Sequence, residues 1–322
     1  MNDLQGRILY GEAPDPTEEI LIGKRVVEGG TVADKIIGKA IVRKLNSNLD
    51  KYFSDSSWGY RPGRSPEMTI QHVRKAVRGG AHCVLRTDVK RFFAYVDRDI
   101  LRKKLAHWVP DNALADFIMA HISPVLLRRG KPTIVERTGL PEGNTITPFL
   151  SNVYLDELDQ ALSGFLYFRY ADDILVLGHT RHEVVNAKNT IKQVLRQLGL
   201  RLNPEKTFIS DLYRQPVVFL GYELRGGRIY PPAKAIRRLE WQLRVRGQGD
   251  GRVLMDSFVR RYRIGSVRKL FRRLDRRLGQ LYPPGVTLVG LLAVKTKVEG
   301  LTKPARHRVG HLGNSLRRRP QS

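Results

Sequence analysis

The chain has 322 residues and a formal net charge of +26, because it contains 57 lysines and arginines but only 31 aspartates and glutamates. Hydrophobic residues make up 41% of the sequence, a share typical of a globular protein with sizeable cores. Cys83 is the single cysteine, which excludes an internal disulfide, and no apolar run is long enough to predict a membrane span. The first residues carry acids and no apolar segment, so we expect a cytoplasmic protein without a secretory signal.

The positive charge is concentrated near the end of the chain. Residues 233–322 hold 23 Lys and Arg against 5 Asp and Glu. A surface of this charge density favours a polyanion as its partner, and nucleic acid is the usual one. The alternative is a basic, solvated tail without a partner.

Apolar spacing predicts the first elements in chain order. Helices are predicted over residues 32–53 and 67–78, separated by a loop rich in Gly, Pro and Arg at 57–66. A strand is predicted over 81–93 and places Asp88 near its end. Asp97 is placed to cap the helix that follows.

The second half of the chain begins with a Gly/Pro loop that leads into a helix, which Thr147 can cap and Pro148 can open. A hairpin follows, and then a helix over 182–198 and a strand over 216–224. Basic helices are predicted beyond them, over residues 233–245 and 253–282, with a break at Gly265.

The hairpin contains the stretch RYADDILVLGHT, in which Asp172 and Asp173 stand side by side between apolar runs. Adjacent like charges repel, and apolar flanks make their ionisation harder. One interpretation is a plain turn, because Asp favours turns and the flanking runs are β-rich. The other is a metal site, in which a divalent cation removes the repulsion and gains two ligands.

A third carboxylate supports the metal site. Asp88 ends another predicted strand, and carboxylates at adjacent strand ends can hold two Mg²⁺ ions for in-line displacement at phosphorus. Mg²⁺ prefers hard oxygen ligands and also binds substrate phosphates. The sequence therefore predicts that Asp88, Asp172 and Asp173 bind two Mg²⁺ ions in one active site.

Seven segments between residues 24 and 280 carry a resemblance to a known family. They are SWGYRPGRS (57–65), LRTDVKRFF (85–93), GLPEGNTITPFLSNVYLDELD (139–159), YADD (170–173), LGLRLNPEKTFI (198–209), VVFLGYEL (217–224) and FVRRYRIGSVRKLFRRLDRRL (258–278). In this order they resemble a prokaryotic reverse transcriptase of the group II intron lineage. YADD alone is a weak signal, but the ordered set is a strong one.

The resemblance implies an α+β fold of the right-hand polymerase type, with palm, fingers and a helical basic thumb. The implied parts are an N-terminal segment and fingers over 1–80, a palm with some fingers elements over 81–232, a thumb over 233–282 and a basic C-terminal segment over 283–322. The implied activity is RNA-directed DNA polymerisation, adding dNTPs to a primer on a structured noncoding RNA template. We expect a standalone bacterial enzyme that serves anti-phage defence.

The resemblance also assigns roles close to the three aspartates. Lys206 lies in the segment where polymerases place a proton donor to the leaving pyrophosphate, although an ordinary surface lysine is the alternative. Phe93 matches the family's steric gate, a ring that clashes with a ribose 2′-hydroxyl and so selects dNTPs. The alternative for Phe93 is a core aromatic.

Other residues of the resemblance would contact the incoming nucleotide. Basic residues at Lys24, Arg25 and Lys35 would neutralise the triphosphate, with solvated side chains as the alternative. Gly143 and Asn144 would allow close approach of the base, with a plain loop-to-helix turn as the alternative.

A further set would contact template or primer. It comprises Arg61, Arg64, Phe219, Gly221, Tyr222, Arg268, Arg272 and Arg276. The first two suit the template backbone or, alternatively, scaffold their own loop. The segment from Phe219 to Tyr222 resembles the primer grip and would also serve the core. The three later arginines lie on the basic side of a predicted helix, where each phosphate contact would release counterions.

The sequence departs from the family pattern in several places. Glu142 stands where the family has Gln, and Ala94 stands where it has Asp. The maturase segment lacks its usual Trp, and no Cys/His-rich nuclease module follows it. Two alternatives therefore stay open: a maturase-type RNA-binding protein for intron splicing or mobility, and a template-independent polymerase on the same fold.

Overall fold

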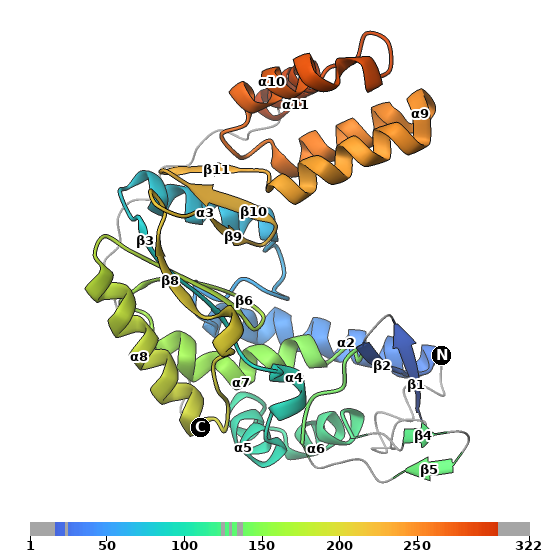
Figure 1. The fold of residues 1–322 in the computed structure, drawn as a ribbon. Coiled ribbons are helices and arrows are strands. Elements are labelled where there is room, and N and C mark those ends of the chain that lie inside the picture. The colour runs from blue at the N-terminus through green and yellow to red at the C-terminus, as the bar shows by residue number, and fades with distance from the viewer. Residues whose placement is uncertain (1–16, 23–24, 124–125, 129–130, 134–137, 302–322) are drawn as a thin grey trace. The chain divides into compact units, whose positions relative to one another are not determined.

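The computed structural model describes residues 17–22, 25–123, 126–128, 131–133 and 138–301 (Figure 1). The chain forms two compact units, which are described separately. Unit 1 comprises Met1–Thr69 and Gly80–Asp211, and unit 2 comprises Ile70–Gly79 and Leu212–Ser322. The boundaries of palm, fingers and thumb stay a prediction.

Unit 1 is built on a four-stranded antiparallel sheet with the strand order β6-β7-β3-β8. Its strands are β6 (Leu166–Tyr170), β7 (Asp173–Gly178), β3 (Cys83–Asp88) and β8 (Phe208–Asp211). Nearly all residues of the two central strands are buried, β7 is almost continuously apolar, and Leu85 pairs with Val176 in the middle of the sheet. The strand predicted over 81–93 is shorter than expected, because β3 ends at Asp88 and the residues Phe92–Tyr95 form a short helix instead.

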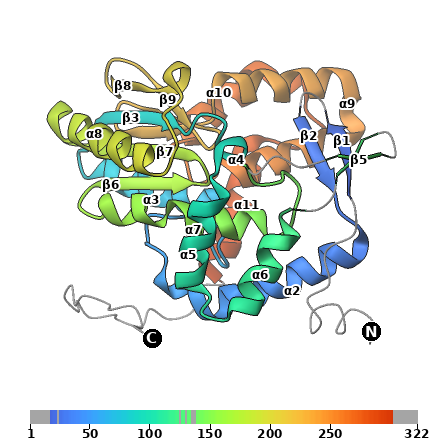
Figure 2. The ribbon, with the colours of Figure 1, turned by 90° about the horizontal axis from the view of Figure 1, so that it is seen from below.

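Helices complete unit 1. They are α2 (Val32–Leu49), α4 (Phe92–Tyr95), α5 (Arg98–Trp108), α6 (Asn112–His121), α7 (Thr147–Ala161) and α8 (Arg181–Gln197). Helix α8 packs on β3 and β7, and α7 lies beside α8 and α5 (Figure 2). Helix α5 begins where the Asp97 carboxylate accepts the backbone N–H groups of Asp99 and Ile100, which confirms the predicted cap.

Short elements surround this core. A second sheet of unit 1 has the order β2-β1-β4-β5. Its strands are β1 (Thr17–Ile22), β2 (Arg25–Gly29), β4 (Leu126–Arg128) and β5 (Lys131–Thr133). Two 3₁₀ turns, η1 (Asp50–Tyr52) and η2 (Pro204–Lys206), lie within loops. The sequence pattern did not indicate this second sheet.

Unit 2 combines a small sheet with long helices. Its elements are the end of α3 (Pro66–Arg78), β9 (Val217–Phe219), β10 (Tyr222–Arg225), β11 (Arg228–Tyr230), α9 (Ala233–Tyr262), α10 (Arg268–Leu278), the 3₁₀ turn η3 (Gly279–Leu281) and α11 (Leu288–Leu301). The guanidinium of Arg74 on α3 donates to the carbonyl of Ile264 at 2.6 Å and ties this helix to the thumb-like helices. Helix α11 packs on both α9 and α10.

Three expectations need correction. The predicted strand over 216–224 is a hairpin of β9 and β10, because Leu220 and Gly221 both have positive φ and form a two-residue turn. Thr147 is the first residue of α7 rather than its cap, and its hydroxyl donates to the carbonyl of Pro141 at 2.9 Å. The basic helix predicted to end at residue 245 continues to Tyr262.

The continuous helix α9 has a simple physical reason. Its buried residues Leu239, Leu243, Met255 and Val259 give it an apolar side at both ends, and tertiary packing outweighs the cost of its interior glycines. Gly265 lies between α9 and α10, which confirms the predicted break. Among the helices in the described part of the chain, none combines the length and apolar character that crossing a bilayer requires.

Candidate active site

The three predicted carboxylates meet at one end of the unit 1 sheet. Asp88 and Asp173 are register partners on β3 and β7. Asp172 occupies the two-residue turn between β6 and β7, and its carbonyl accepts the backbone N–H of Val89 at 3.2 Å. Ala171, the other turn residue, has a positive φ of 57°, which a non-glycine residue rarely adopts. The fold therefore brings together side chains that are far apart in the sequence.

Two cationic side chains accompany this carboxylate cluster. Lys206 forms an ion pair with Asp88, and Arg86 forms one with Asp173. Burial raises the pKa of Asp173 to about 6, although Arg86 opposes the shift and the other two aspartates add to it. The hydrogen bond to Asp88 raises the pKa of Lys206. Sequence reasoning missed Arg86, whose signal is a charged residue that follows the apolar start of strand β3.

The carboxylate cluster fits a hard divalent cation. Asp88 is only 7% exposed, and its Oδ1 is buried and accepts no hydrogen bond from the described residues. A buried carboxylate oxygen without a donor is costly, so an ion at this position would satisfy it. Carboxylate oxygens are also the ligands that Mg²⁺ and similar ions prefer.

The segment around Lys206 is attached to the end of β3 by backbone hydrogen bonds. The N–H of Lys90 donates to the carbonyl of Arg201 at 2.9 Å, and the N–H of Asn203 donates to the carbonyl of Asp88 at 2.9 Å. Hydroxyls of Thr87 and Thr207 join the same two segments at 2.6 Å. These bonds place Lys206 beside Asp88, and its role as a proton donor stays a prediction.

Phe93 lies in the short helix α4 and is half-buried against the core. Its ring meets that of Phe92 edge to face, with centroids 5.1 Å apart. Its carbonyl accepts the N–H of Leu140 at 2.6 Å, and a Cβ on Gly139 would lie 2.9 Å from the same oxygen. The loop that begins at Gly139 is thus fixed against Phe93, and only glycine allows this close approach.

Asn144 and Gly143 take different places in that loop. The Asn144 amide donates to the carbonyl of His121 at 2.9 Å, and its Oδ1 accepts the N–H of Ile146 at 2.9 Å. These contacts favour the turn-forming alternative for Asn144. Gly143 is exposed with φ +98°, so its backbone is accessible to a ligand. Glu142, the departure from the family pattern, is half-buried beside it.

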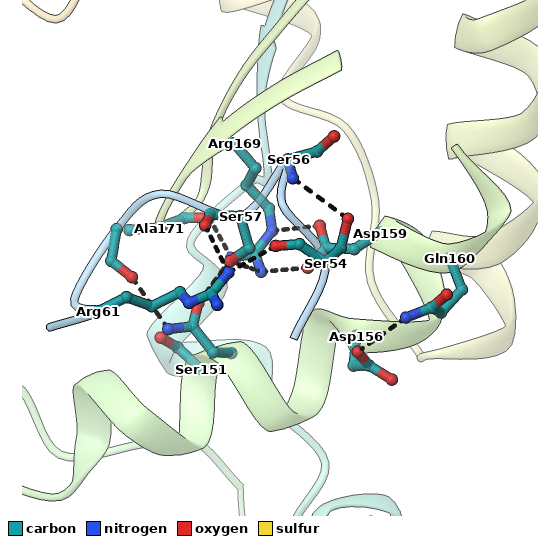
Figure 3. A network of polar contacts seen from close by, with 12 residues as sticks. Ser54, Ser56, Ser57, Arg61, Ser151, Asp156, Asp159, Gln160, Arg169 and Ala171 are labelled. Carbon is teal, nitrogen blue, oxygen red and sulfur yellow. Dashed lines mark hydrogen bonds and ion pairs between the residues drawn. The ribbon is translucent and has the colours of Figure 1, made fainter. Parts of the chain in front are cut away.

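A buried ion pair anchors the aspartate turn (Figure 3). Arg169, fully buried in β6, donates to both carboxylate oxygens of Asp159 at 2.7 and 2.5 Å. The same guanidinium donates to the hydroxyl of Ser57 at 2.7 Å and to the carbonyl of Ala171 at 3.0 Å. Burial raises the pKa of Asp159, and the adjacent Arg169 opposes that shift. Neither partner was singled out from the sequence, where Arg169 is the one charge of strand β6 and Asp159 is one of three acids of helix α7.

The loop over 57–65 lies directly against the same turn. The N–H of Trp58 donates to the carbonyl of Arg169 at 2.8 Å, and the Asn152 amide donates to the carbonyl of Gly59 at 2.9 Å. A Cβ on Gly59 would lie 2.5 Å from the backbone nitrogen of Ala171. The SWGYRPGRS and YADD segments are therefore one packed unit, with glycine required at their contact.

The two arginines of this loop point into it. Arg61 has a 2% exposed side chain that donates to Asp50 at 2.7 Å and to the carbonyl of Ser57 at 3.0 Å. Arg64 donates to Asp55 at 2.7 Å and stacks over the ring of Trp58. These contacts favour the loop-scaffold alternative for both arginines.

Of the three basic residues predicted to contact the triphosphate, the structure describes the side chain of one. Lys35 is exposed on α2. Lys24 lies outside the described residues, and so does the side chain of Arg25 in β2. Their role at the triphosphate stays a prediction.

In unit 2, the segment that resembles the primer grip is largely internal. Phe219 and Tyr222 are 0% and 1% exposed, and the Tyr222 hydroxyl donates to the carbonyl of Arg261. A Cβ on Gly221 would lie 2.7 Å from the Arg261 guanidinium. The two aromatic side chains therefore belong to the core of unit 2. Leu220 and Gly221 form the turn that connects β9 to β10.

Unit 2 also contains a basic cavity of about 1010 Å³. Among the described residues, its cationic lining comprises Arg74, Arg78, Arg225, Arg228, Arg263, Arg268, Lys269 and Arg273, and Glu223 is the one acidic residue of that lining. The positive charges of this lining lie close together. Burial and the nearby charge of Arg78 lower the pKa of Arg74. Of the three predicted arginines of α10, Arg268 lines the cavity, while Arg272 and Arg276 are exposed elsewhere on the helix.

Comparison with known proteins agrees with this geometry. The family "Reverse transcriptase (RNA-dependent DNA polymerase)" matches residues 21–224. The chain is 26% identical over 268 residues to the putative COX1/OXI3 intron 1 protein of Saccharomyces cerevisiae, covering 63% of the chain and 31% of that protein. It is 28% identical over 155 residues to the group II intron-encoded protein LtrA of Lactococcus lactis, covering 46% of the chain and 25% of LtrA.

The fold has a parallel among solved structures. Telomerase from Candida albicans, solved with a fragment of telomeric RNA, is similar with a TM-score of 0.56 at 12% identity, over 87% of this chain and 56% of that one. The chain thus spans about a third or less of these two curated relatives and shares the α+β polymerase fold. It belongs to the reverse transcriptase family of RNA-dependent DNA polymerases, in the lineage that includes group II intron-encoded proteins.

Proposed function

We propose that the chain is an RNA-directed DNA polymerase that adds dNTPs to a primer on an RNA template. The observation that carries the proposal is the meeting of Asp88, Asp172 and Asp173 at one end of the sheet, with a buried oxygen of Asp88 that lacks a hydrogen-bond donor among the described residues. Such a cluster suits phosphoryl transfer and explains why the chain places repelling charges in an apolar hairpin. Membership of the reverse transcriptase family supports the same conclusion.

Two Mg²⁺ ions are the proposed cofactors, held by Asp88, Asp172 and Asp173. When bound, they would stabilise negative charge on the transferring phosphoryl group and favour ionisation of the attacking hydroxyl. The chain's own contribution is to hold the carboxylates in place. Arg86 orients Asp173, and the buried pair of Arg169 and Asp159 supports the turn that carries Asp172.

Lys206 and Phe93 are proposed to act on the nucleotide. The Lys206 side chain is 62% exposed, so it can leave Asp88 and donate a proton to the departing pyrophosphate. The Phe93 ring is fixed by Phe92 and by the loop bonded to its carbonyl, and this rigidity suits the exclusion of a 2′-hydroxyl.

The basic surface of unit 2 is proposed to bind the template and primer. Eight cations and one carboxylate line its cavity, and the exposed side of α10 adds further arginines. Phosphate groups would relieve the mutual repulsion of these cations, which supports nucleic acid as the partner.

Primer extension tests the proposed activity. The purified full chain, given an RNA template, an annealed DNA primer, dNTPs and Mg²⁺, should produce DNA that survives alkaline hydrolysis of the template. The Asp172→Asn variant should produce none. If DNA-templated and RNA-templated reactions both fail while the folded protein binds RNA, the polymerase proposal is wrong.

The intron-encoded relatives favour a second function, in which the chain binds a structured intron RNA and assists its splicing or mobility. We propose a cytoplasmic setting in anti-phage defence as the primary role. Sequencing the RNA that co-purifies with the full chain distinguishes the splicing function from the defence role. Intron RNA would support the maturase-type function, and a short dedicated noncoding RNA, together with phage resistance that depends on Asp172, would support defence.

A further inference from the structure

A second cluster of metal-ligand side chains lies at the opposite end of β3 from Asp88. It comprises His82, Cys83 and Asp211, whose ligand atoms all lie within 4.8 Å of one another. Cys83 begins β3 and Asp88 ends it, so this cluster shares no residue with the carboxylate cluster. It combines imidazole, thiol and carboxylate groups, a set typical of transition-metal sites.

Local structure positions the three side chains. Cys83 and Asp211 are register partners on β3 and β8, so their side chains lie on the same face of the sheet. The backbone N–H of His82 donates to the carbonyl of Gly178 at 3.0 Å and fixes the residue next to the strand. All these residues belong to unit 1.

The imidazole of His82 is oriented as in a metal ligand. Its Nδ1 lies 3.0 Å from the carbonyl oxygen of Gly80. A ring N–H that donates to a backbone carbonyl leaves the lone pair on the other nitrogen, an arrangement that commonly supports metal-bound histidine. That other nitrogen, Nε2, lies 4.0 Å from Oδ2 of Asp211. The lone pair of that nitrogen therefore lies on the side of the ring that faces Asp211.

We propose that His82, Cys83 and Asp211 bind one Zn²⁺ ion, with solvent as the fourth ligand. With bonds of about 2.3 Å to sulfur and about 2.0–2.2 Å to nitrogen and oxygen, ligand atoms in a tetrahedral site stand roughly 3.3–3.7 Å apart. Closing the present separations to that range needs shifts of about 1 Å or less, within the reach of side-chain rotation. Thiolate and imidazole select Zn²⁺ over Mg²⁺, so this site would not compete for the ions of the carboxylate cluster.

Binding requires the thiol to lose its proton. Burial raises the pKa of Cys83, and the carboxylates of Asp211 and Glu183 raise it further while Arg181 opposes them. On binding, a zinc–sulfur bond replaces the S–H bond and the proton passes to solvent, with no change in oxidation state.

The ion would strengthen the edge of the sheet. Among the described strands, β8 lies at the edge of this sheet and pairs with β3, and Asp211 is the last residue of unit 1. A zinc bridge from Asp211 to Cys83 and His82 would fasten β8 at the point where the chain leaves the sheet. Such a site stabilises the folded state because the unfolded chain does not assemble the three ligands.

Cobalt substitution tests the site, because Co²⁺ reports its ligands by absorption. Full-length protein freed of metal with a chelator is titrated with Co²⁺ and then with Zn²⁺. We expect a thiolate-to-cobalt charge-transfer band in the near ultraviolet, visible bands of a tetrahedral site, and loss of both on adding one equivalent of Zn²⁺. Because Cys83 is the single cysteine, a thiolate band can arise from no other residue.

Variants decide the ligand set. Cys83→Ser should abolish the charge-transfer band, and Asp211→Asn and His82→Gln should each lower Co²⁺ affinity by about 100-fold or more. Asp172→Asn, which alters the separate carboxylate cluster, should leave the band intact. If wild-type protein gives no band, or if Asp211→Asn and His82→Gln bind Co²⁺ as tightly as wild type, the proposed site is wrong. Unchanged circular dichroism of these two variants separates ligand loss from unfolding.

Discussion

Asp88 and Asp173 stand opposite each other as register partners at the end of strands β3 and β7, and each forms an ion pair with its own cation. Lys206 pairs with Asp88, and Arg86 pairs with Asp173. The two cations offset a repulsion that burial would otherwise intensify. This relationship is the origin of the first two predictions.

Neutralising a carboxylate should abolish catalysis. Asp88→Asn or Asp172→Asn should lower dNTP incorporation by several orders of magnitude, because a neutral amide binds divalent cations weakly and the ions stabilise the transferring phosphoryl group. Primer extension measures the effect. Asp97→Asn is the matched control, since Asn caps α5 as well as Asp does and should keep full activity. Full activity of the Asp88 or Asp172 variant would overturn the catalytic assignment.

Asp173→Asn should stabilise the metal-free fold in a pH-dependent manner. Burial raises the pKa of Asp173 from 3.8 to about 6 in the folded state, so ionisation above this pH opposes folding. At about pH 8 the variant should gain roughly 2–3 kcal/mol of unfolding free energy, since a tenfold change in an ionisation constant corresponds to about 1.4 kcal/mol. The gain should shrink as the pH falls through 6 and vanish below about 4, where Asp173 is neutral in both states.

Urea unfolding in the presence of a chelator measures this gain at several pH values. Saturating Mg²⁺ should reduce it, because wild-type protein then gains ligand-binding energy that the variant lacks. A stability difference independent of pH would show that Asp173 carries no buried charge.

Phe93→Ala or Phe93→Val should raise incorporation of ribonucleotides relative to dNTPs, because each change removes the ring proposed to clash with a 2′-hydroxyl. Primer extension with each nucleotide set measures the preference. Phe93→Tyr keeps the bulk and should keep the selection. An unchanged preference in the smaller variants would make Phe93 a core aromatic only.

Reversing three charges on α10 should weaken nucleic-acid binding. With Arg268, Arg272 and Arg276 changed to Glu, the slope of log affinity against log salt should fall by about 3, at roughly 0.9 for each phosphate contact. Binding of a template–primer duplex at several salt concentrations measures the slope. Equal slopes and affinities in variant and wild type would mean that this side of α10 is merely solvated.

The control for this experiment is a second set of three cations at the same helical spacing. Lys188, Lys192 and Arg196 on α8 border a smaller cavity in unit 1. Their reversal gives the same change in net charge and should have the smaller effect. Equal losses in both triple variants would indicate a general charge effect rather than a contact at α10.

Breaking the buried pair behind the aspartate turn should destabilise unit 1. Asp159→Leu or Arg169→Met leaves one buried charge without its partner, and this costs about 3–5 kcal/mol. The double variant Asp159→Leu with Arg169→Met should lose less than the sum of the single changes. Urea unfolding of the three proteins provides the measurement. Additive losses would contradict a direct interaction.

Much of the fold followed from local sequence pattern. Spacing of apolar residues predicted α2 and α8, and the Asp97 cap predicted the start of α5, because helix formation depends on neighbours within a few residues. Alternation and turn chemistry predicted the β6–β7 hairpin. The sequence pattern predicted the wrong end for α9, because tertiary packing determines its length. The helix continues past its glycines since residues on both sides of them are buried in unit 2.

The sequence by itself determined the three aspartates as a candidate metal site, since like charges in an apolar hairpin need a compensating cation and the ordered motifs supplied the family resemblance. Only the tertiary structure decided their surroundings. Arg86 and Lys206 reach their aspartates, and Arg169 reaches Ser57, through strand register and loop attachment, and such contacts depend on residues far apart in the chain. The same reason hid the cluster of His82, Cys83 and Asp211, because its last ligand joins the other two only when β8 pairs with β3.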